Sequence, residues 1–186
     1  MNEREKTAYH EAGHAVMARE LRIRILRVTI VPAEDYDGLM VPGTQGRGFR
    51  PDIDVTTRTA ERVEREIMVR FAGPWAASLY SGKKPRLEGP DFETSADLAL
   101  YVASSEEGTN AYLEWLWIRT RDFLKHRPFV WSAVEALAKA LLEQGTIGGR
   151  KAGAIIIQAE REALEKARQD GSKSAGGGPS GSGQEL

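Results

Sequence analysis

The sequence predicts a mainly α-helical fold with a small β-sheet, an α+β domain. Two observations lead to this prediction. Several long segments repeat their apolar residues at helical spacing, whereas only one segment, residues 23–31, is rich in β-branched residues that partly alternate with Arg and Thr. The length of 186 residues is enough for one domain with a hydrophobic core.

The overall composition is that of a soluble globular protein, with 41% hydrophobic and 28% charged residues. A net charge of −1 gives no electrostatic reason to expect nucleic acid or an anionic membrane as a partner. There is no cysteine, so any metal must be held by His, Asp or Glu. No segment has the length or composition of a membrane span or a signal peptide, and we expect a cytoplasmic location.

In the first half of the chain, residues 2–20 predict a helix that begins with a capping box at Asn2 and Glu5. Residues 23–31 predict a strand that ends at Pro32. The Gly- and Pro-rich residues 33–53 predict a loop with one short strand at 38–41. A long helix should run over 54–80 from an Asp54 cap, with a kink or break at Gly73-Pro74.

In the second half, residues 82–92 predict a loop, and helices should cover 94–105, 109–126, 128–143 and 150–168. Pro128 suits the first turn of its helix, Gly145 should end that helix, and Gly148-Gly149 should form a turn. The Gly/Ser-rich end has little to bury. We therefore expect a domain at 1–169 followed by a disordered tail at 170–186.

The most informative segment is His10-Glu11-Ala12-Gly13-His14, which matches the H-E-x-x-H signature of zinc hydrolases. On a helix, this spacing places both imidazoles on one face, one turn apart, where they can bind one ion. Glu11 would then lie near the open side of the metal and could act as a general base toward water. Only three histidines occur in the chain, so coincidence is a poor explanation of the pattern.

A catalytic zinc site needs a third protein ligand. His126 lies in a basic segment at an expected helix end, where a solvated histidine is the simpler interpretation. Asp91 and Glu93 are expected in a loop, and Asp97 at the start of a helix. Thr94 and Asp97 could also form only a capping box. The spacing alone does not choose among the three carboxylates.

Several segments resemble the protease domain of FtsH-type ATP-dependent zinc metalloproteases. They are, in order, 7–16 around the H-E-x-x-H motif, 27–32, 38–39, 67–73, 94–98 and 138–149, so the resemblance spans about residues 5–160. The resemblance implies a zincin-like FtsH-type peptidase domain in which His10, His14 and Asp97 bind Zn²⁺. It implies Glu11 as the catalytic base, with Glu93 the next choice for the third ligand.

The sequence also departs from this family. The family's proteases carry an ATPase domain and membrane helices before the protease, whereas these residues contain no G-x-x-x-x-G-K-[ST] segment. Acidic residues that the family pattern has after its Ala-Gly are absent from Ala72–Ser78. If those groups orient a zinc-binding histidine, Glu64 or Glu66 would have to replace them here.

The expected function is that of a zinc endopeptidase which cleaves unfolded or flexible polypeptides without ATP of its own. A separate unfoldase or adaptor could deliver substrates, and an oligomer is possible. The alternative is a protease-derived zinc-binding interaction module with weak or no activity. In that case one of Trp115 and Trp117, which point in different directions on a helix, could anchor a partner.

Overall fold

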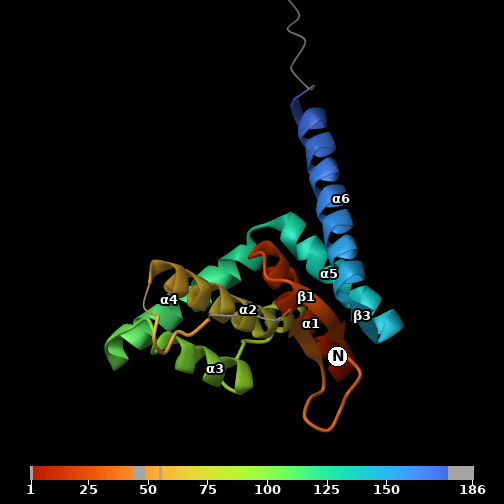
Figure 1. Ribbon diagram of the computed structural model, residues 1–186. Helices are drawn as coiled ribbons and strands as arrows, with labels where there is room; N and C mark the ends of the chain where they lie inside the picture. The colour runs from red at the N-terminus through yellow and green to blue at the C-terminus, as the bar shows by residue number, and fades with distance from the viewer. Residues whose placement is uncertain (1, 44–48, 55, 176–186) are drawn as a thin grey trace, which may run out of the picture.

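The computed structural model describes residues 2–43, 49–54 and 56–175 and confirms a mainly helical fold with a small sheet (Figure 1). The elements in chain order are α1 (Glu3–Glu20), β1 (Ile25–Thr29), β2 (Leu39–Pro42), α2 (Thr57–Ser81), α3 (Pro90–Ala99), α4 (Glu106–Lys125), α5 (Pro128–Gln144), β3 (Thr146–Gly148) and α6 (Gly149–Ala175).

Helix α1 lies at the centre of the fold, where it packs against α2, α5 and the sheet. The predicted capping box is confirmed, because the Asn2 side chain accepts from the Arg4 amide and Glu5 reaches back to the Asn2 backbone. The middle of the helix is buried on all sides and consists mainly of small residues: Ala8, Ala12, Gly13, Ala15, Val16 and Ala18. Small side chains let the neighbouring backbones approach closely.

The sheet is antiparallel with the strand order β2-β1-β3. Its central strand β1 is shorter than the predicted 23–31, and its Val28 is fully buried between Met40 of β2 and Ile147 of β3. The three-residue strand β3 is not predicted by the sequence, because Thr146–Gly148 is too short to show alternation and contains a glycine. Within the described residues β2 pairs with β1 only, so it is an edge strand.

Helix α2 runs without interruption through Gly73-Pro74, and the predicted break does not occur. A proline inside a helix removes one backbone hydrogen bond. Here the surrounding turn is held by tertiary packing, since Ala72, Gly73, Ala76 and Ala77 are all buried. The predicted apolar side is confirmed by Val63, Ile67 and Phe71, which are buried in the core.

Helix α3 begins at Pro90, four residues before the predicted start at Thr94. Proline is favoured at the first helical position, because its missing N–H has no helical partner there and its φ is already helical. The predicted capping box of Thr94 and Asp97 therefore does not form, since Thr94 lies inside the helix. Asp91 and Glu93 belong to a helix rather than to a loop, which changes the direction in which they point.

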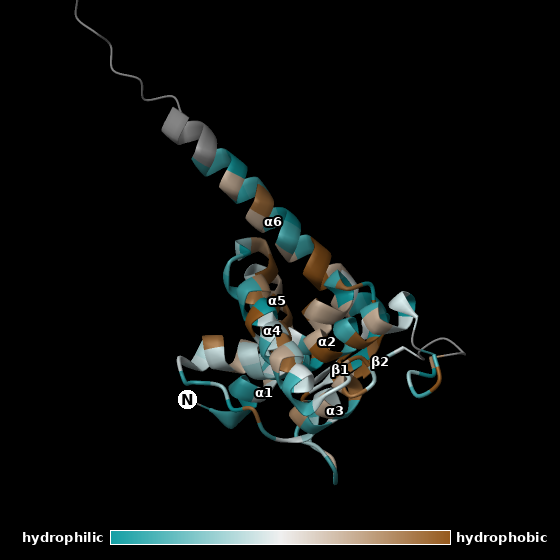
Figure 2. Ribbon diagram, turned by 90° about the vertical axis from the view of Figure 1, so that its left-hand side faces the viewer, coloured by the Kyte–Doolittle hydropathy of each residue, from teal (hydrophilic) through white to brown (hydrophobic). Residues whose placement is uncertain are grey.

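The C-terminal half follows the prediction more closely. α5 begins at Pro128 and ends at Gly145, whose φ of 72° is the conformation that favours glycine. α6 extends away from the body of the molecule, and its turns alternate between hydrophilic and hydrophobic (Figures 1 and 2). It continues to Ala175, past residue 170, where the tail was expected to begin. Residues 176–186 of that tail lie outside the described residues.

The two tryptophans of α4 have different surroundings, as their spacing predicts. Trp117 packs against Phe71 and Trp75, with ring centroids 5.0 and 4.7 Å away. Trp115 leaves 56% of its surface exposed. One tryptophan thus belongs to the core margin and the other to the surface.

None of the helices in the described part of the chain combines the length and the apolar character that a membrane crossing requires.

We expect Gly13→Ala to destabilise the protein by roughly 1–3 kcal/mol, the range of overpacked cores. A Cβ at this position would lie 2.5 Å from both the Ala72 carbonyl oxygen and the Ala76 Cβ, so α1 and α2 would have to move apart. Urea unfolding of the metal-free protein measures the change.

Gly153→Ala is the matched control, because a Cβ at Gly153 in α6 meets nothing within 4 Å. Alanine should there raise the free energy of unfolding by about 0.5–1 kcal/mol through its higher helix propensity. Equal effects of the two substitutions would contradict the proposed close contact between α1 and α2.

Candidate metal centre and catalytic groove

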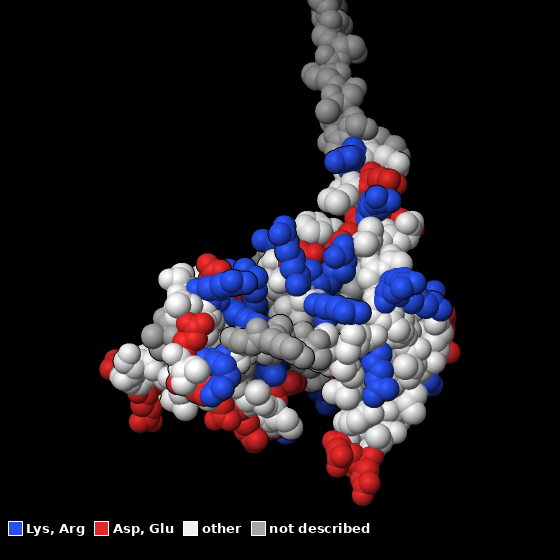
Figure 3. All heavy atoms as spheres, viewed as in Figure 1, with Lys and Arg blue, Asp and Glu red and all other residues white. Residues whose placement is uncertain are grey.

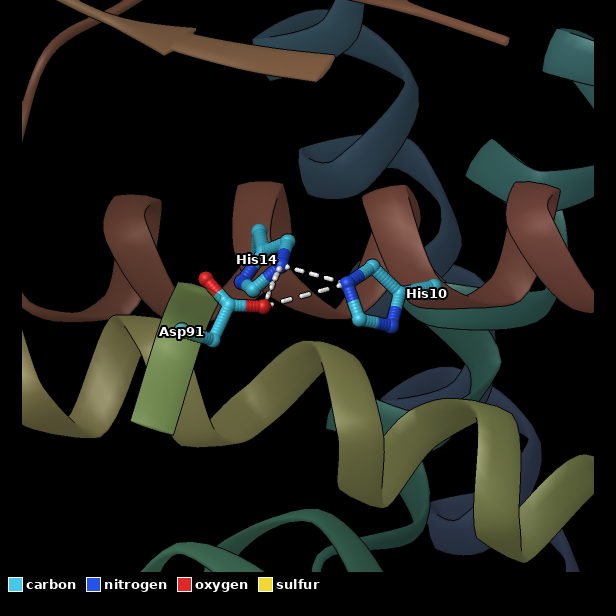
Figure 4. Close-up of side chains that lie close together, drawn as sticks. All are labelled: His10, His14 and Asp91. Carbon is cyan, nitrogen blue, oxygen red and sulfur yellow. Dashed lines mark hydrogen bonds and ion pairs between the residues drawn. The ribbon is translucent and has the colours of Figure 1, made fainter. Parts of the chain in front are cut away.

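Helix α1 presents His10 and His14 on one face, one turn apart, as the sequence predicts. Their Nε2 atoms lie 2.9 Å from each other, and their rings are nearly perpendicular, at 84° (Figure 4). His14 is buried and His10 is half-buried at the edge of a cavity. The two imidazoles therefore direct one nitrogen each into the same small space.

The third member of this group is Asp91, near the start of α3 (Figure 4). Its Oδ2 atom lies 3.2 Å from Nε2 of His10 and 3.2 Å from Nε2 of His14. Each of the three residues offers one ligand atom, and these three atoms all lie within 4.8 Å of one another. Two helices that are about 80 residues apart in the sequence thus form one cluster of metal-binding side chains.

Asp97, the third ligand that the resemblance implies, is not part of this group, nor is Glu93. Both side chains are exposed. The reason is the way α3 packs: it buries Ser95 and Ala99 and contacts α2 and α4, which leaves Asp91 in its first turn beside the histidines and turns residues 93 and 97 toward solvent. Asp91, which the spacing alone left open, is the carboxylate that meets the histidines.

His126 lies away from this group, as expected. It is exposed at the C-terminal end of α4, where its Nε2 atom is 3.9 Å from an Asp122 carboxylate oxygen.

His14 is oriented by the backbone of α2. Its Nδ1 atom donates to the Val69 carbonyl oxygen at 2.7 Å, which leaves Nε2 free for a ligand. No acidic residue of Ala72–Ser78 is needed for this contact. Glu66 instead pairs with Arg70, and Glu64 with Arg119, so neither contacts the histidine. Every residue has a backbone carbonyl, so the sequence contains no signal for this contact.

Gly73 keeps the space between the histidines open. A Cβ at this position would overlap the His14 imidazole and lie 2.8 Å from Nε2 of His10. The sequence suggested only a helix-breaking role for Gly73. In the structure its lack of a side chain allows the backbone of α2 to pass directly against the Nε2 atoms of both histidines.

Glu11 lies beside the cluster without belonging to it. It is 5% exposed, and its Oε2 atom has no hydrogen-bond partner among the described residues. Burial raises the pKa of Glu11, although His14, His10 and the Met40 backbone amide act in the opposite direction. A buried carboxylate with a raised pKa and one oxygen without a partner is suited to accept a proton from a water molecule in the cavity.

Asp91 and His14 stabilise each other's charged forms. Burial opposes the charge of Asp91, but the two histidines outweigh it and hold the pKa of Asp91 well below its usual range. Burial likewise lowers the pKa of His14, whereas the charge and hydrogen bond of Asp91 raise it, and the pKa reaches about 9. Without a metal, the cluster holds a proton at neutral pH that a metal ion would have to displace.

A cavity of about 750 Å³ surrounds this cluster. α1 forms one wall with Thr7, His10, Glu11 and His14, and the edge strand β2 with its preceding loop forms the opposite wall. Gly38 lies directly against Glu11, since a Cβ there would be 2.9 Å from the Glu11 Cγ atom. The cavity thus lies along an edge strand, and an edge strand can pair with an extended chain.

The three side chains fit a tetrahedral zinc ion. Zn–N distances of 2.0–2.1 Å place neighbouring ligand atoms about 3.3 Å apart. The atoms His10 Nε2, His14 Nε2 and Asp91 Oδ2 lie 2.9, 3.2 and 3.2 Å apart. Two imidazoles and one carboxylate are also a ligand set of catalytic zinc sites, where water takes the fourth position.

We expect Asp91→Ala to weaken zinc binding at least 100-fold, because it removes one of three ligands, while Asp97→Ala and Glu93→Ala leave the affinity within about twofold. Isothermal titration of the metal-free protein measures all three. The two exposed carboxylates serve as matched controls, since they lie on the same short helix. Loss of zinc with Asp97→Ala but not with Asp91→Ala would contradict the site described here.

We also expect the metal-free protein to lose stability as the pH rises from 6.5 to about 9. The folded pKa of His14 is raised from 6.5 to about 9, so its contribution is fully present below pH 6.5 and is lost as the pH rises through 9. Asp91, with a lowered pKa, contributes above its ordinary pKa of 3.8 and loses that contribution on acidification. Stability from this pair should therefore be greatest between about pH 4 and 6.5 and fall by roughly 1–3 kcal/mol toward pH 9.

Urea unfolding in the presence of a chelator measures this dependence, and Asp91→Asn is its control. Glu160, whose pKa is raised to about 7 mainly by burial, titrates in the same window and is present in both proteins. The difference between the two proteins thus isolates the Asp91–His14 pair. The same pH profile in both would contradict the charge coupling.

Comparison with known proteins does not assign this site. No protein-family model matches the chain, and the comparison with curated proteins gave no match either. What the site can do is therefore argued from its own geometry.

Proposed function

We propose that this protein is a zinc-dependent endopeptidase that hydrolyses peptide bonds in unfolded or flexible polypeptides. The observation that carries the proposal is the convergence of His10, His14 and Asp91 beside Glu11, in a groove bordered by an edge strand. Each part has a role in peptide hydrolysis, and the parts lie close enough to act on one bound peptide.

His10, His14 and Asp91 would hold the metal through Nε2, Nε2 and Oδ2. A bound zinc ion supplies Lewis acidity, which polarises a carbonyl and lowers the pKa of water to about 7. The Val69 carbonyl keeps the His14 ring in the orientation that this role needs. Gly73 leaves room at both nitrogens, because any side chain there would lie against them.

Glu11 would act as the general base and then as the general acid. Its carboxylate accepts a proton from the attacking water, and the water oxygen forms a bond with the carbonyl carbon of the substrate. Glu11 then donates that proton to the leaving amine as the C–N bond breaks. The raised pKa of Glu11 favours both steps, because it brings the proton affinity of the carboxylate closer to neutral pH.

The substrate would lie extended along β2. This strand pairs with β1 on one side only, so its other edge can form backbone hydrogen bonds with a peptide. Such binding requires an unfolded segment. These 186 residues contain no P-loop sequence, which is why we expect flexible substrates or delivery by a separate unfoldase or adaptor.

The FtsH-type identity remains part of this proposal. The H-E-x-x-H segment and the burial of Glu11 beside the histidines support it. A helix about 80 residues later in the sequence, which brings a carboxylate to the histidines, supports it as well. The third ligand fits less well, because the residue at the cluster is Asp91 and the residue suggested by the resemblance is Asp97. Cytoplasmic location and self-association also remain expectations.

We expect Glu11→Gln to keep zinc binding within about threefold and to lower the rate of casein cleavage by at least 10³-fold. Glutamine has the same shape but cannot accept the proton, and general-base catalysis typically contributes 10²–10⁴-fold. Fluorescein-labelled casein reports cleavage, and isothermal titration reports zinc binding on the same preparation.

Exposed Glu93 supplies the matched control, since Glu93→Gln makes the same chemical change near the groove and should leave the rate unchanged. Unchanged cleavage with Glu11→Gln would contradict the mechanism. Bound zinc without cleavage of any unfolded substrate by the wild type would instead favour the interaction module, with exposed Trp115 as its first surface to test.

A further inference from the structure

A second cavity, of about 560 Å³, lies beside the catalytic groove and is lined by arginines. Arg19 comes from the end of α1, Arg22 and Arg24 from the segment that leads into β1, and Arg150 from the first turn of α6. None of the described residues that line this cavity is acidic. Figure 3 shows basic side chains gathered over β1 and around the base of α6.

This arginine cavity adjoins the catalytic groove. Ile23 lines both of them, and Pro42 at the end of β2 lines the groove on the same side. The Gly43 amide at the end of β2 donates to the Arg24 carbonyl oxygen, which fixes the arginine segment beside the edge strand. A peptide that follows β2 from Gly38 toward Pro42 therefore moves from Glu11 toward the arginines.

Three of the four arginine side chains are not neutralised by the described residues, whereas the charge of Arg19 partly offsets the raised pKa of Glu160. Among the described residues, Arg22, Arg24 and Arg150 form no ion pair, and their side chains are exposed. The Nε atom of Arg19 is buried without a hydrogen-bond partner in the same part of the chain. Guanidinium groups favour carboxylates, which they bind through paired hydrogen bonds.

Arg22 adopts a backbone conformation that disfavours a side chain. Its φ is 60°, and it is the residue with which the chain leaves α1, where glycine is usual. In the described part of the chain it is the only non-glycine residue with positive φ. An arginine at this position destabilises the turn relative to glycine, so the turn itself does not explain the side chain.

The opposite end of the groove has the opposite charge. Asp35 and Asp37 line it in the loop between β1 and β2, together with Glu3, which is 3.7 Å from Lys6. Figure 3 shows acidic side chains at the tip of this loop, below the basic face. A bound peptide would thus experience positive potential at one end and mainly negative potential at the other.

The geometry points to a carboxylate subsite: the arginine cavity binds an acidic group of the peptide substrate, on the side of the cleaved bond that follows β2 past Pro42. This inference rests on the proposed peptidase function. Gly38, beside Glu11, and Pro42 are four residues apart, which is about 13 Å in a strand. The acidic group should therefore lie four to five residues from the cleaved bond. It can be a Glu or Asp side chain or a terminal carboxylate.

The test uses fluorescent ten-residue peptides with blocked ends and a neutral sequence, in which one Glu replaces Gln at each position in turn. A further peptide has Gln throughout and a free C-terminus. Anisotropy with zinc-loaded Glu11→Gln protein measures binding, and cleavage by the wild type measures kcat/KM. We expect one Glu position to improve both quantities at least 10-fold. The free C-terminus improves them only if a terminal carboxylate can occupy the same subsite.

Substitutions in the arginine cavity test whether its arginines cause the preference for Glu. Arg22→Glu/Arg24→Glu should abolish the preference for Glu and favour Lys at the same peptide position. Arg22→Gly should weaken the preference without loss of folding stability, because glycine suits the positive φ. Exposed Arg168 in α6 lines neither cavity, so Arg168→Glu is the matched control and should keep the preference.

The possible failures are distinct. If the wild type cleaves none of the peptides, the peptidase proposal fails, while the anisotropy arm still tests the subsite. If peptides bind or are cleaved equally well with Glu and Gln at every position, the subsite is overturned. A preference for Glu that persists in Arg22→Glu/Arg24→Glu also overturns it.

Discussion

The close contact between α1 and α2 is the constraint on which the site depends. Gly13 lets the backbone of α2 approach α1, because any Cβ there would overlap Ala72 and Ala76. Gly73, next to Ala72 on α2, leaves room for the imidazoles of His10 and His14. The same approach brings the Val69 carbonyl within hydrogen-bond distance of His14. Two glycines thus make room for the two histidines, and one carbonyl orients His14.

The packing of α1 also affects which side chains of the site carry a charge. His14 and Glu11 are buried by the packing of α1, and an isolated buried charge is unfavourable. Asp91 compensates for the positive charge of His14, whereas nothing among the described residues pairs with Glu11 Oε2. The cluster therefore suits a cation, and Glu11 is kept available for a proton. The charge also differs along the groove, which has carboxylates at one end and arginines beside the other.

Much of the fold is predictable from sequence because its signals are local. The capping box at Asn2, the helical apolar spacing of α2 and Pro128 at the start of α5 all depend on residues within a few turns of one another. Predictions were less accurate where tertiary packing overrides a local signal. Gly73-Pro74 predicted a kink or break in α2, but with this segment buried the helix stays continuous. β3 was missed because it is a strand only through its pairing with β1.

For the site, the sequence by itself determined His10, Glu11 and His14, since helical periodicity alone places them on adjoining faces of one helix. Only the tertiary structure showed which carboxylate meets the histidines. Asp91, Glu93 and Asp97 are chemically alike, and the choice among them depends on how α3 packs against the rest of the fold. The roles of Gly73 and of the Val69 carbonyl, and the proximity of the arginines to the groove, likewise depend on contacts between segments far apart in the chain. Spacing within one segment carries no information about such contacts.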